Sequence, residues 1–242
     1  MKSFFLPETE STNQSLRLLA DTGNIVDKSM VWTGFQTKGR GQAGNTWESA
    51  PGMNLLCSIL LYPQQLPANQ SFAILTLAAL SVKYTLDEYA PDITIKWPND
   101  IYLSNKKISG ILIENEIAGG FITCSIIGIG INLNQTEFTS DAPNPISLSM
   151  YTGLTYEIKT VLNQLHAKFN MQTSQLEAGL FDQLHQQYYA SLYLRDDFHP
   201  YKDAYGFFKA RIHSIEPSGH IILERENGAL SRYGFKEVSV IQ

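Results

Sequence analysis

The pattern of apolar and polar residues divides the chain into segments with helical spacing and segments typical of strands. The first part predicts a helix at 11–23, strands at 30–36 and 53–61, a central helix at 68–89, a strand at 93–97, a hairpin at 99–116 and a strand at 121–134. Helical spacing returns at 158–169 and again at 174–192, and a polar linker at 193–201 follows. The last segments, 207–215, 220–226, 229–235 and 236–241, read as short strands separated by turns.

This order of elements predicts two domains. Residues 1–194 read as an α+β domain, and residues 195–242 read as a small all-β domain. The dipeptide Asn227-Gly228 is a strong signal for a tight hairpin turn. Consecutive short strands of this kind are typical of a small barrel.

Composition places the chain among ordinary globular proteins. It has 242 residues, 43% of them hydrophobic and 17% charged, with a net charge of -5 that argues weakly against nucleic-acid binding. The only cysteines, Cys57 and Cys124, fit neither a metal motif nor a disulfide framework, so we expect buried thiols in a reducing compartment. No apolar run is long enough to span a bilayer, and the N-terminus lacks the pattern of a signal peptide. We therefore expect a cytoplasmic protein without a membrane partner.

The segment GFQTKGRGQAGNTWESAPG, residues 34–52, is the clearest candidate for chemistry. Its glycines at 39, 41 and 44 alternate with Lys38 and Arg40, so backbone N–H groups and cations can gather around an anion. It lacks the P-loop pattern, and no helix follows its GxGxxG spacing, which disfavours a dinucleotide-binding fold. Taken alone, it reads equally well as a flexible surface loop.

Four further segments accompany this loop: ESTNQ at 10–14, KWPND at 96–100, KKISGILIE at 106–114 and GIGINLN at 128–134. In order and spacing the set resembles the biotin–protein ligases over residues 9–134, and more weakly beyond. The resemblance implies a mixed sheet with flanking helices, similar to class II aminoacyl-tRNA synthetases, plus a C-terminal SH3-like barrel. It also implies two half-reactions: biotin and ATP form biotinyl-5′-AMP and pyrophosphate, and a lysine of a biotin carboxyl carrier protein domain then takes the biotin.

The resemblance also implies roles for particular residues. The expected biotin-binding residues are Ser11, Thr12, Asn13, Gln36, Gly39, Arg40, Gly41, Gln42 and Lys107. The expected ATP-binding residues are Arg40, Trp47, Lys96, Asn99, Lys107 and Asn132. Catalysis is expected to rest on Arg40, Lys96, Asp100 and Lys107, and Asn99 and Asp100 are the candidates for Mg²⁺ held mainly through phosphates.

These roles agree with the chemistry of the groups. The reaction joins a carboxylate to a triphosphate, so cations that position both anions should dominate. The amide of Asn132 matches the donor–acceptor pattern of adenine, and Trp47 can fold over the adenylate when the loop closes and excludes water. Two questions stay open: Ser11 and Thr12 can also cap a helix, and Asp100 can bind metal or activate the acceptor lysine.

The sequence departs from the bacterial pattern at Gln42 and Asn45, where many relatives carry cations. As given, it begins at the catalytic motif, whereas bifunctional relatives carry an N-terminal winged helix, so we expect no specific DNA binding. Relatives often pair through sheet edges, which leaves a homodimer open. Two alternatives also remain: a non-catalytic paralogue that binds biotin or the carrier, and a lipoate-type ligase on the related fold.

Overall fold

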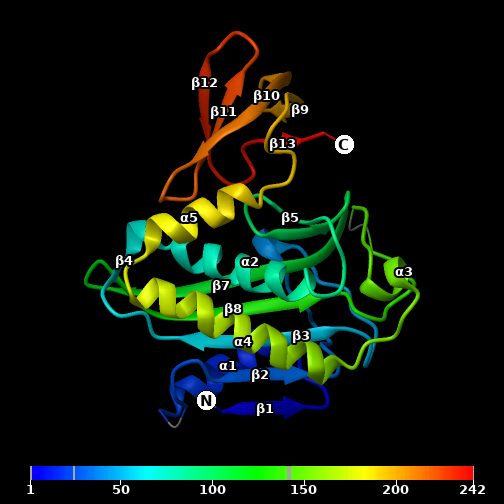
Figure 1. The fold of residues 1–242 in the computed structure, drawn as a ribbon. Helices are drawn as coiled ribbons and strands as arrows, with labels where there is room; N and C mark the ends of the chain where they lie inside the picture. Colours follow the sequence, from blue (N-terminus) through cyan, green and yellow to red (C-terminus); the bar gives the residue numbers. More distant parts are fainter. Residues whose placement is uncertain (1, 24, 141–142, 242) are drawn as a thin grey trace.

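A large mixed sheet forms the centre of the molecule (Figure 1). The computed structural model describes residues 2–23, 25–140 and 143–241. The strands run in the order β1-β2-β3-β8-β7-β6-β5, and β4 pairs with β8 outside this path. They are β1 (Ser3–Leu6), β2 (Met30–Thr33), β3 (Leu55–Leu61), β4 (Leu66–Pro67), β5 (Ile93–Lys96), β6 (Asp100–Leu103), β7 (Lys106–Ala118) and β8 (Phe121–Ile131). The β1–β2 pair is parallel, and the other recorded pairs of this sheet are antiparallel.

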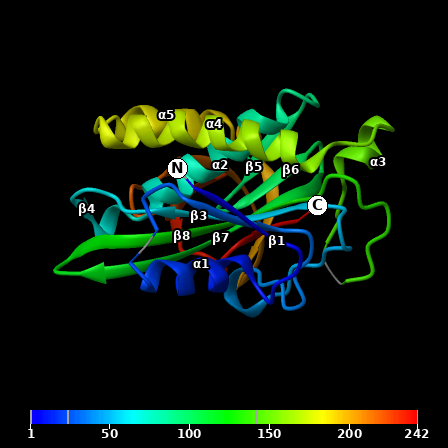
Figure 2. The same ribbon diagram turned by 90° about the horizontal axis from the view of Figure 1, so that it is seen from below.

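Helices cover both faces of this sheet. Figure 2 shows α2 (Phe72–Leu86), α4 (Ile158–Glu177) and α5 (Phe181–Ala190) on one face and α1 (Thr12–Asp21) on the other. The short α3 (Leu148–Thr152) lies beside one end of the sheet. Every residue of β3 is buried because the strand is central and covered on both faces, which explains its unbroken apolar run.

Two hydrophobic clusters hold these layers. The smaller cluster joins Leu16 of α1 to Val31, Leu60, Cys124 and Ile126 of the sheet. The larger cluster lies between the sheet and α2, α4 and α5. Because α2 is packed between the sheet and the other two helices, it is apolar on nearly all sides.

The C-terminal residues form a second, five-stranded sheet in the order β12-β11-β10-β9-β13. Its strands are β9 (His199–Asp203), β10 (Gly206–Ile215), β11 (Ile221–Arg225), β12 (Leu230–Tyr233) and β13 (Ser239–Val240). Its buried residues, among them Tyr201, Ile212 and Leu223, belong to the same cluster as the helices of the large sheet. Trp97 Nε1 donates to the carbonyl oxygen of Gly219 at 2.9 Å, so the two sheets are also joined by a hydrogen bond.

Most predicted elements are present, and the differences have physical causes. The second of the two later helices begins at Phe181 and not at residue 174, because Gly179 adopts a φ of +72° after α4 ends at Glu177. The predicted linker at 193–201 is wrong from His199 onward, where β9 pairs with β10 and β13. Of its five residues only Tyr201 is buried, so the strand has no alternating apolar pattern to recognise. The sequence pattern also missed β1, β4 and α3, which are short.

The structure also bears on the cysteines and on membrane association. Cys57 and Cys124 are free and buried, as expected, and burial raises the pKa of the Cys57 thiol to about 12. Each helix in the described part of the chain is too short or too polar to cross a lipid bilayer.

Candidate functional site

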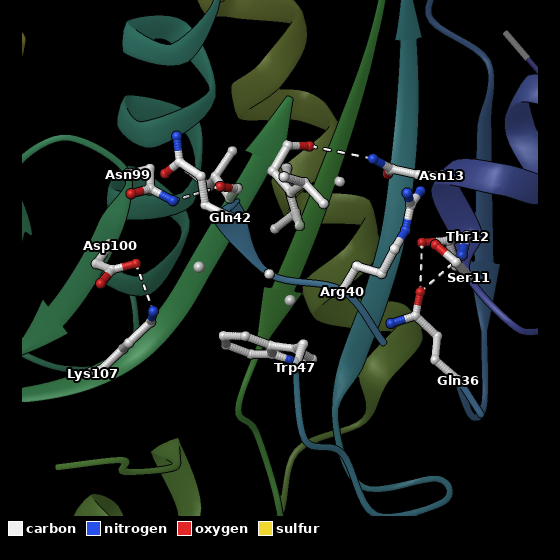
Figure 3. A pocket seen from close by; sticks show the side chains of 17 residues that line it. Ser11, Thr12, Asn13, Gln36, Arg40, Gln42, Trp47, Asn99, Asp100 and Lys107 are labelled. Carbon is white, nitrogen blue, oxygen red and sulfur yellow. Dashed lines mark hydrogen bonds and ion pairs between the residues drawn. The ribbon is translucent and has the colours of Figure 1, made fainter. Parts of the chain in front are cut away.

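Two adjoining cavities lie between the glycine loop, residues 34–52, and the strands β7 and β8. The inner cavity has a volume of about 50 Å³ and the outer cavity about 660 Å³. The inner cavity is lined by Ser11, Thr12, Asn13, Gln36, Arg40, Gly41, Gln42, Trp47, Asn99, Asp100, Lys107, Gly110, Ile111, Leu112, Gly128, Ile129 and Gly130 (Figure 3). The outer cavity shares six of these residues and adds, among others, Trp97, Asn132, Phe138 and Phe235. The structure therefore brings together most of the residues that the sequence predicts for the site.

The innermost wall is a connected set of hydrogen bonds at the start of α1. Gln36 Oε1 accepts from the backbone N–H of Thr12 at 2.8 Å, and Thr12 Oγ1 lies 3.1 Å from the same oxygen. Asn13 Nδ2 lies 3.2 Å from Glu114 Oε2 and 3.5 Å from the carbonyl oxygen of Leu112. Ser11 occupies the N-cap position, but its side chain makes no capping hydrogen bond. The Ser11 hydroxyl therefore does not cap α1, which was the alternative role considered for this residue.

Two cations line the inner cavity, and each is paired with a carboxylate. Lys107 Nζ lies 2.7 Å from Asp100 Oδ1, and Arg40 Nη2 lies 3.0 Å from Glu114 Oε1. Figure 3 shows the Arg40 side chain extending between Gln36 and Asn13. Small-molecule sites usually measure about 300–1,000 Å³. The inner cavity is far smaller, and side chains of the glycine loop, including Arg40, form part of its wall.

The glycine loop folds back on itself as a small hairpin. Arg40 and Thr46 form an isolated bridge, and Trp47 N donates to the carbonyl oxygen of Gly39 at 3.0 Å. A Cβ on Gly39 would lie 2.4 Å from the carbonyl oxygen of Trp47, so only glycine fits there. This fold carries the Trp47 side chain back onto the sheet.

The Trp47 indole lies directly over two glycines that face each other on β7 and β8. Cβ atoms placed on Gly110 and Gly130 would lie 2.9 Å and 2.5 Å from its ring. Lys107 Nζ lies 5.7 Å from the centre of the same ring. The glycines of the GIL and GIGIN motifs therefore make room for a flat aromatic group at this point.

Three buried polar atoms around the cavities have no hydrogen-bond partner among the described residues. They are Gln42 Oε1, Trp47 Nε1 and Asn132 Oδ1. Asn132 Nδ2 donates to the carbonyl oxygen of Ile146 at 3.1 Å, which orients the unpartnered oxygen. Since buried polar groups are nearly always hydrogen-bonded, atoms of this kind point to a ligand that supplies the missing partners.

Glu48 ties the glycine loop to the loop that walls the outer cavity. Its carboxylate accepts from Thr139 N, Thr139 Oγ1 and Ser140 N at 2.8–3.1 Å. Burial alone would raise the pKa of Glu48, but these hydrogen bonds from Ser140 and Thr139 outweigh it and lower the pKa. Phe138 and Ser140, which line the outer cavity, are thereby anchored to the glycine loop.

Two residues of the predicted site do not line either cavity. Gly39 lies behind its neighbours in the loop, where it accepts from Trp47 N. Lys96 Nζ donates to Tyr102 Oη at 3.0 Å and lies 5.0 Å from the centre of that ring. Burial lowers the pKa of Lys96, and the nearby Asp100 carboxylate offsets part of this effect. In this conformation Lys96 therefore belongs to the packing behind the site.

Sequence reasoning missed three residues that hold the site together: Glu48, Glu114 and Ser58. The Ser58 hydroxyl oxygen lies 2.7 Å from Thr12 Oγ1 and 2.6 Å from Asn13 Oδ1. Glu114 lies within the KKISGILIE motif, and Ser58 is the one hydroxyl in the apolar run of β3. A lone hydroxyl within a fully buried strand is a usable signal, because it must find a partner. Glu48 carries no such signal in the sequence.

Comparisons with known proteins agree with this geometry. A family model described as "Biotin/lipoate A/B protein ligase family" matches residues 5–132. The chain is 30% identical over 178 residues to a biotin–[acetyl-CoA-carboxylase] ligase of Paracoccus denitrificans, with 71% of this chain and 73% of that protein covered. It is 37% identical over 149 residues to the bifunctional ligase/repressor BirA of Bacillus subtilis, with 59% of this chain and 45% of that protein covered. The chain thus spans about half the length of the bifunctional relatives that it matches.

Among solved structures, a biotin protein ligase from Aquifex aeolicus in complex with biotin and ATP superposes over the whole chain. The TM-score is 0.80 and the sequence identity 25%, with 100% of this chain and 99% of that chain covered. Both the large sheet and the C-terminal sheet therefore have counterparts in one known protein.

Proposed function

This chain belongs to the biotin/lipoate A/B protein ligase family, and from that membership and the geometry of the site we propose that it is an ATP-dependent biotin–protein ligase. In the first half-reaction an oxygen of the biotin carboxylate attacks the α-phosphate of ATP. This forms biotinyl-5′-AMP and releases pyrophosphate. In the second, the amine of a carrier lysine attacks the acyl carbon, and AMP leaves.

The observation that carries the proposal is the arrangement of the two cavities around one shared wall. A deep end with neutral donors and acceptors adjoins an outer cavity of about 660 Å³, and Lys107 and Asp100 line both. A neutral ureido head suits the deep end, and a nucleotide suits the outer one. The carboxylate and the α-phosphate would then meet beside Lys107.

Lys107 is the residue best placed to act on the reacting atoms. Its ammonium group projects from the start of β7 at the wall that the two cavities share. The ion pair with Asp100 at 2.7 Å holds this charge in position before substrate arrives. A preorganised cation stabilises the charge that develops on the phosphate oxygens at little reorganisation cost.

Asn132 and Trp47 are proposed to bind the nucleotide. The unpartnered Asn132 Oδ1 is an acceptor that fits the exocyclic amine of adenine. The unpartnered Trp47 Nε1 is a donor that fits a phosphate oxygen. Lys96 lies behind Tyr102, so its proposed contact with the phosphates requires that its hydrogen bond to Tyr102 be replaced.

The residues fit a Mg²⁺ ion that is held mainly by the triphosphate. Asn99 and Asp100 line both cavities and offer amide and carboxylate oxygens. Mg²⁺ bound to phosphates uses few protein ligands. The ion would neutralise charge on the phosphates. Activation of the acceptor lysine is an alternative role for Asp100, through its second carboxylate oxygen.

The partner we propose is a biotin carboxyl carrier protein domain, acting in the cytoplasm. We expect no specific DNA complex, since the net charge is -5. A homodimer through the sheet edges remains a proposal. Three further points are also proposals: the division at residue 194, the likeness of the first part to class II aminoacyl-tRNA synthetases, and the closure of the C-terminal sheet into an SH3-like barrel.

The proposal is tested by biotin-dependent exchange of radiolabelled pyrophosphate into ATP. We expect exchange with biotin and ATP, and none when lipoate replaces biotin. Binding of biotin without exchange would support the non-catalytic paralogue, and exchange with lipoate would support the lipoate-type ligase.

A further inference from the structure

The KWPND segment forms a tight turn between β5 and β6 that presents two polar side chains to the cavities. Lys96 pairs with Asp100 across the two strands, so residues 97–99 make the turn itself. Asn99 and Asp100 line both cavities, and Asp100 Oδ1 lies 2.7 Å from Lys107 Nζ (Figure 3). Because this ion pair holds the ammonium group of Lys107, the position of the KWPND turn affects where that charge lies.

A tyrosine of α5 holds the KWPND turn from behind. Tyr188 is 0% exposed, and its hydroxyl donates to the carbonyl oxygen of Pro98 at 2.7 Å. Its ring packs edge-on against Phe72 at the start of α2, with 5.3 Å between the ring centres. Burial raises the pKa of Tyr188, and the nearby Asp100 carboxylate raises it further, so the hydroxyl keeps its proton and donates. A buried donor from a distant part of the chain thus reaches the turn.

This hydrogen bond acts on a rigid unit that leads directly into the site. The carbonyl of Pro98 and the N–H of Asn99 belong to one planar peptide group, so fixing the oxygen also fixes where Asn99 begins. On the other side of the turn, Asn99 Nδ2 donates to the carbonyl oxygen of Ile111 at 2.7 Å. Ile111 N donates to the Asn99 carbonyl oxygen at 3.1 Å. The turn is therefore held between α5 and β7 immediately before Asp100.

Loss of the Tyr188 hydroxyl would leave the buried carbonyl of Pro98 without this donor. A buried acceptor without a partner is costly, so we expect the turn to shift toward water or another donor. Asp100 follows two residues later, so the shift would also displace its carboxylate and the paired Lys107. Reacting groups tolerate little displacement, since about 1 Å can cost about 100-fold in rate.

We propose that Tyr188 is a positioning residue for the first half-reaction, which holds the KWPND turn through the Pro98 carbonyl so that Asp100 keeps Lys107 at the reacting phosphate. This inference rests on the proposed function and deepens it, since it adds a buried residue of α5 to the same site. Tyr188 lines neither cavity, so it acts only through the turn.

The test compares Tyr188→Phe with the matched control Tyr189→Phe. Tyr189 is the next residue of α5, and its hydroxyl donates to the carbonyl oxygens of Ile212 and His213, both at 3.1 Å. Each variant keeps the ring and removes one hydroxyl from backbone carbonyls, but only Tyr188→Phe releases the KWPND turn. Both variants should therefore lose stability in chemical denaturation, whereas only Tyr188→Phe should alter catalysis.

For each variant, KM and kcat are measured in the exchange assay. In Tyr188→Phe we expect kcat to fall about tenfold with KM for biotin unchanged, because the charge at the reacting phosphate is displaced while the deep end of the inner cavity is not. In Tyr189→Phe both values should stay as in the wild type. When Asp100→Asn has already weakened the pair with Lys107, adding Tyr188→Phe should lower kcat by less than about threefold, since both changes act through the same ion pair.

A kcat in Tyr188→Phe equal to that in Tyr189→Phe would overturn the inference, and so would losses that multiply fully in the double variant. If Tyr188→Phe does not fold, Phe72→Leu decides, because it loosens the Tyr188 ring and should lower kcat without raising KM for biotin. An unchanged kcat there would also count against the inference. A wild-type enzyme without exchange activity would count against the proposed function, whereas an active wild type with an unchanged Tyr188→Phe would count against Tyr188 only.

Discussion

The inner and outer cavities differ in how many of their hydrogen bonds the protein already makes for itself. At the inner end Thr12, Asn13, Gln36 and Ser58 form a connected and buried network. By contrast, Asn132 of the outer cavity and Gln42 and Trp47 at the wall shared by both cavities each keep a buried polar atom without a partner among the described residues. On the proposed function, the inner end binds the biotin head group and the nucleotide supplies the missing partners at the outer end. Lys107 belongs to both ends, so changes there should have the largest effect.

Lys107→Ala is expected to lower the rate of pyrophosphate exchange about 100- to 1,000-fold, because it removes a preorganised cation from the reacting phosphate. Affinity for biotin, measured by calorimetry, should change far less. Lys106→Ala is the matched control, since Lys106 is its exposed neighbour on the same strand. An unchanged exchange rate in Lys107→Ala would remove this lysine from the chemistry.

Arg40→Gly is expected to speed the dissociation of preformed biotinyl-AMP by about 10- to 100-fold, since a charge-assisted hydrogen bond to an anion is lost. Released adenylate should then label nearby lysines without selectivity. Lys38→Gly provides the control, because Lys38 lies in the same loop but pairs with Glu10 at the surface. Gln42→Arg should act in the opposite direction and slow release. If neither change at 40 or 42 alters release, the loop does not clamp the adenylate by charge.

Asn132→Ala is expected to raise KM for ATP about tenfold and to leave KM for biotin unchanged, because it removes one hydrogen bond from the outer end alone. Asn134→Ala is the control. The Asn134 oxygen is already used by Tyr156 N at 2.8 Å and by Ser149 Oγ at 3.0 Å, so this change should lower stability without affecting KM for ATP. Equal effects on both substrates would mean that the two ends are not separate.

Glu48→Gln should have the smallest effect, about 0.5–1 kcal/mol of stability at pH 7, because it weakens charge-assisted hydrogen bonds to Thr139 and Ser140 that solvent partly screens. The pKa of Glu48 is lowered on folding, so its contribution is complete above the ordinary pKa of 4.5 and is lost as the pH falls through the lower folded value. Chemical denaturation of both proteins at pH 7 and pH 3 measures the difference. Glu137→Gln, at an exposed neighbour, should show no difference at either pH.

The sequence predicted the order of elements and most residues of the cavity lining, because the motifs place them at the ends of strands that pair. It could not predict which ion pairs and hydrogen bonds the side chains of these residues form in this conformation. Arg40 pairs with Glu114 and Lys96 donates to Tyr102, and both contacts depend on side-chain directions that spacing does not specify. Nor could it predict β9, since one buried residue in five gives no periodic pattern.

The hydrogen bond from Trp97 to Gly219 has a consequence for anyone who wishes to dissect this protein. A cut at residue 194, between the two domains predicted from the order of elements, would pass through a shared core, since Tyr201, Ile212 and Leu223 pack with the helices of the large sheet. Tyr189 Oη also donates to the carbonyl oxygens of Ile212 and His213, both at 3.1 Å. A fragment ending at 194 would expose that core and leave the Trp97 side-chain N–H, within the KWPND motif, without its acceptor. Split reporters, minimal enzymes and domain swaps should therefore keep the C-terminal sheet with the rest of the chain.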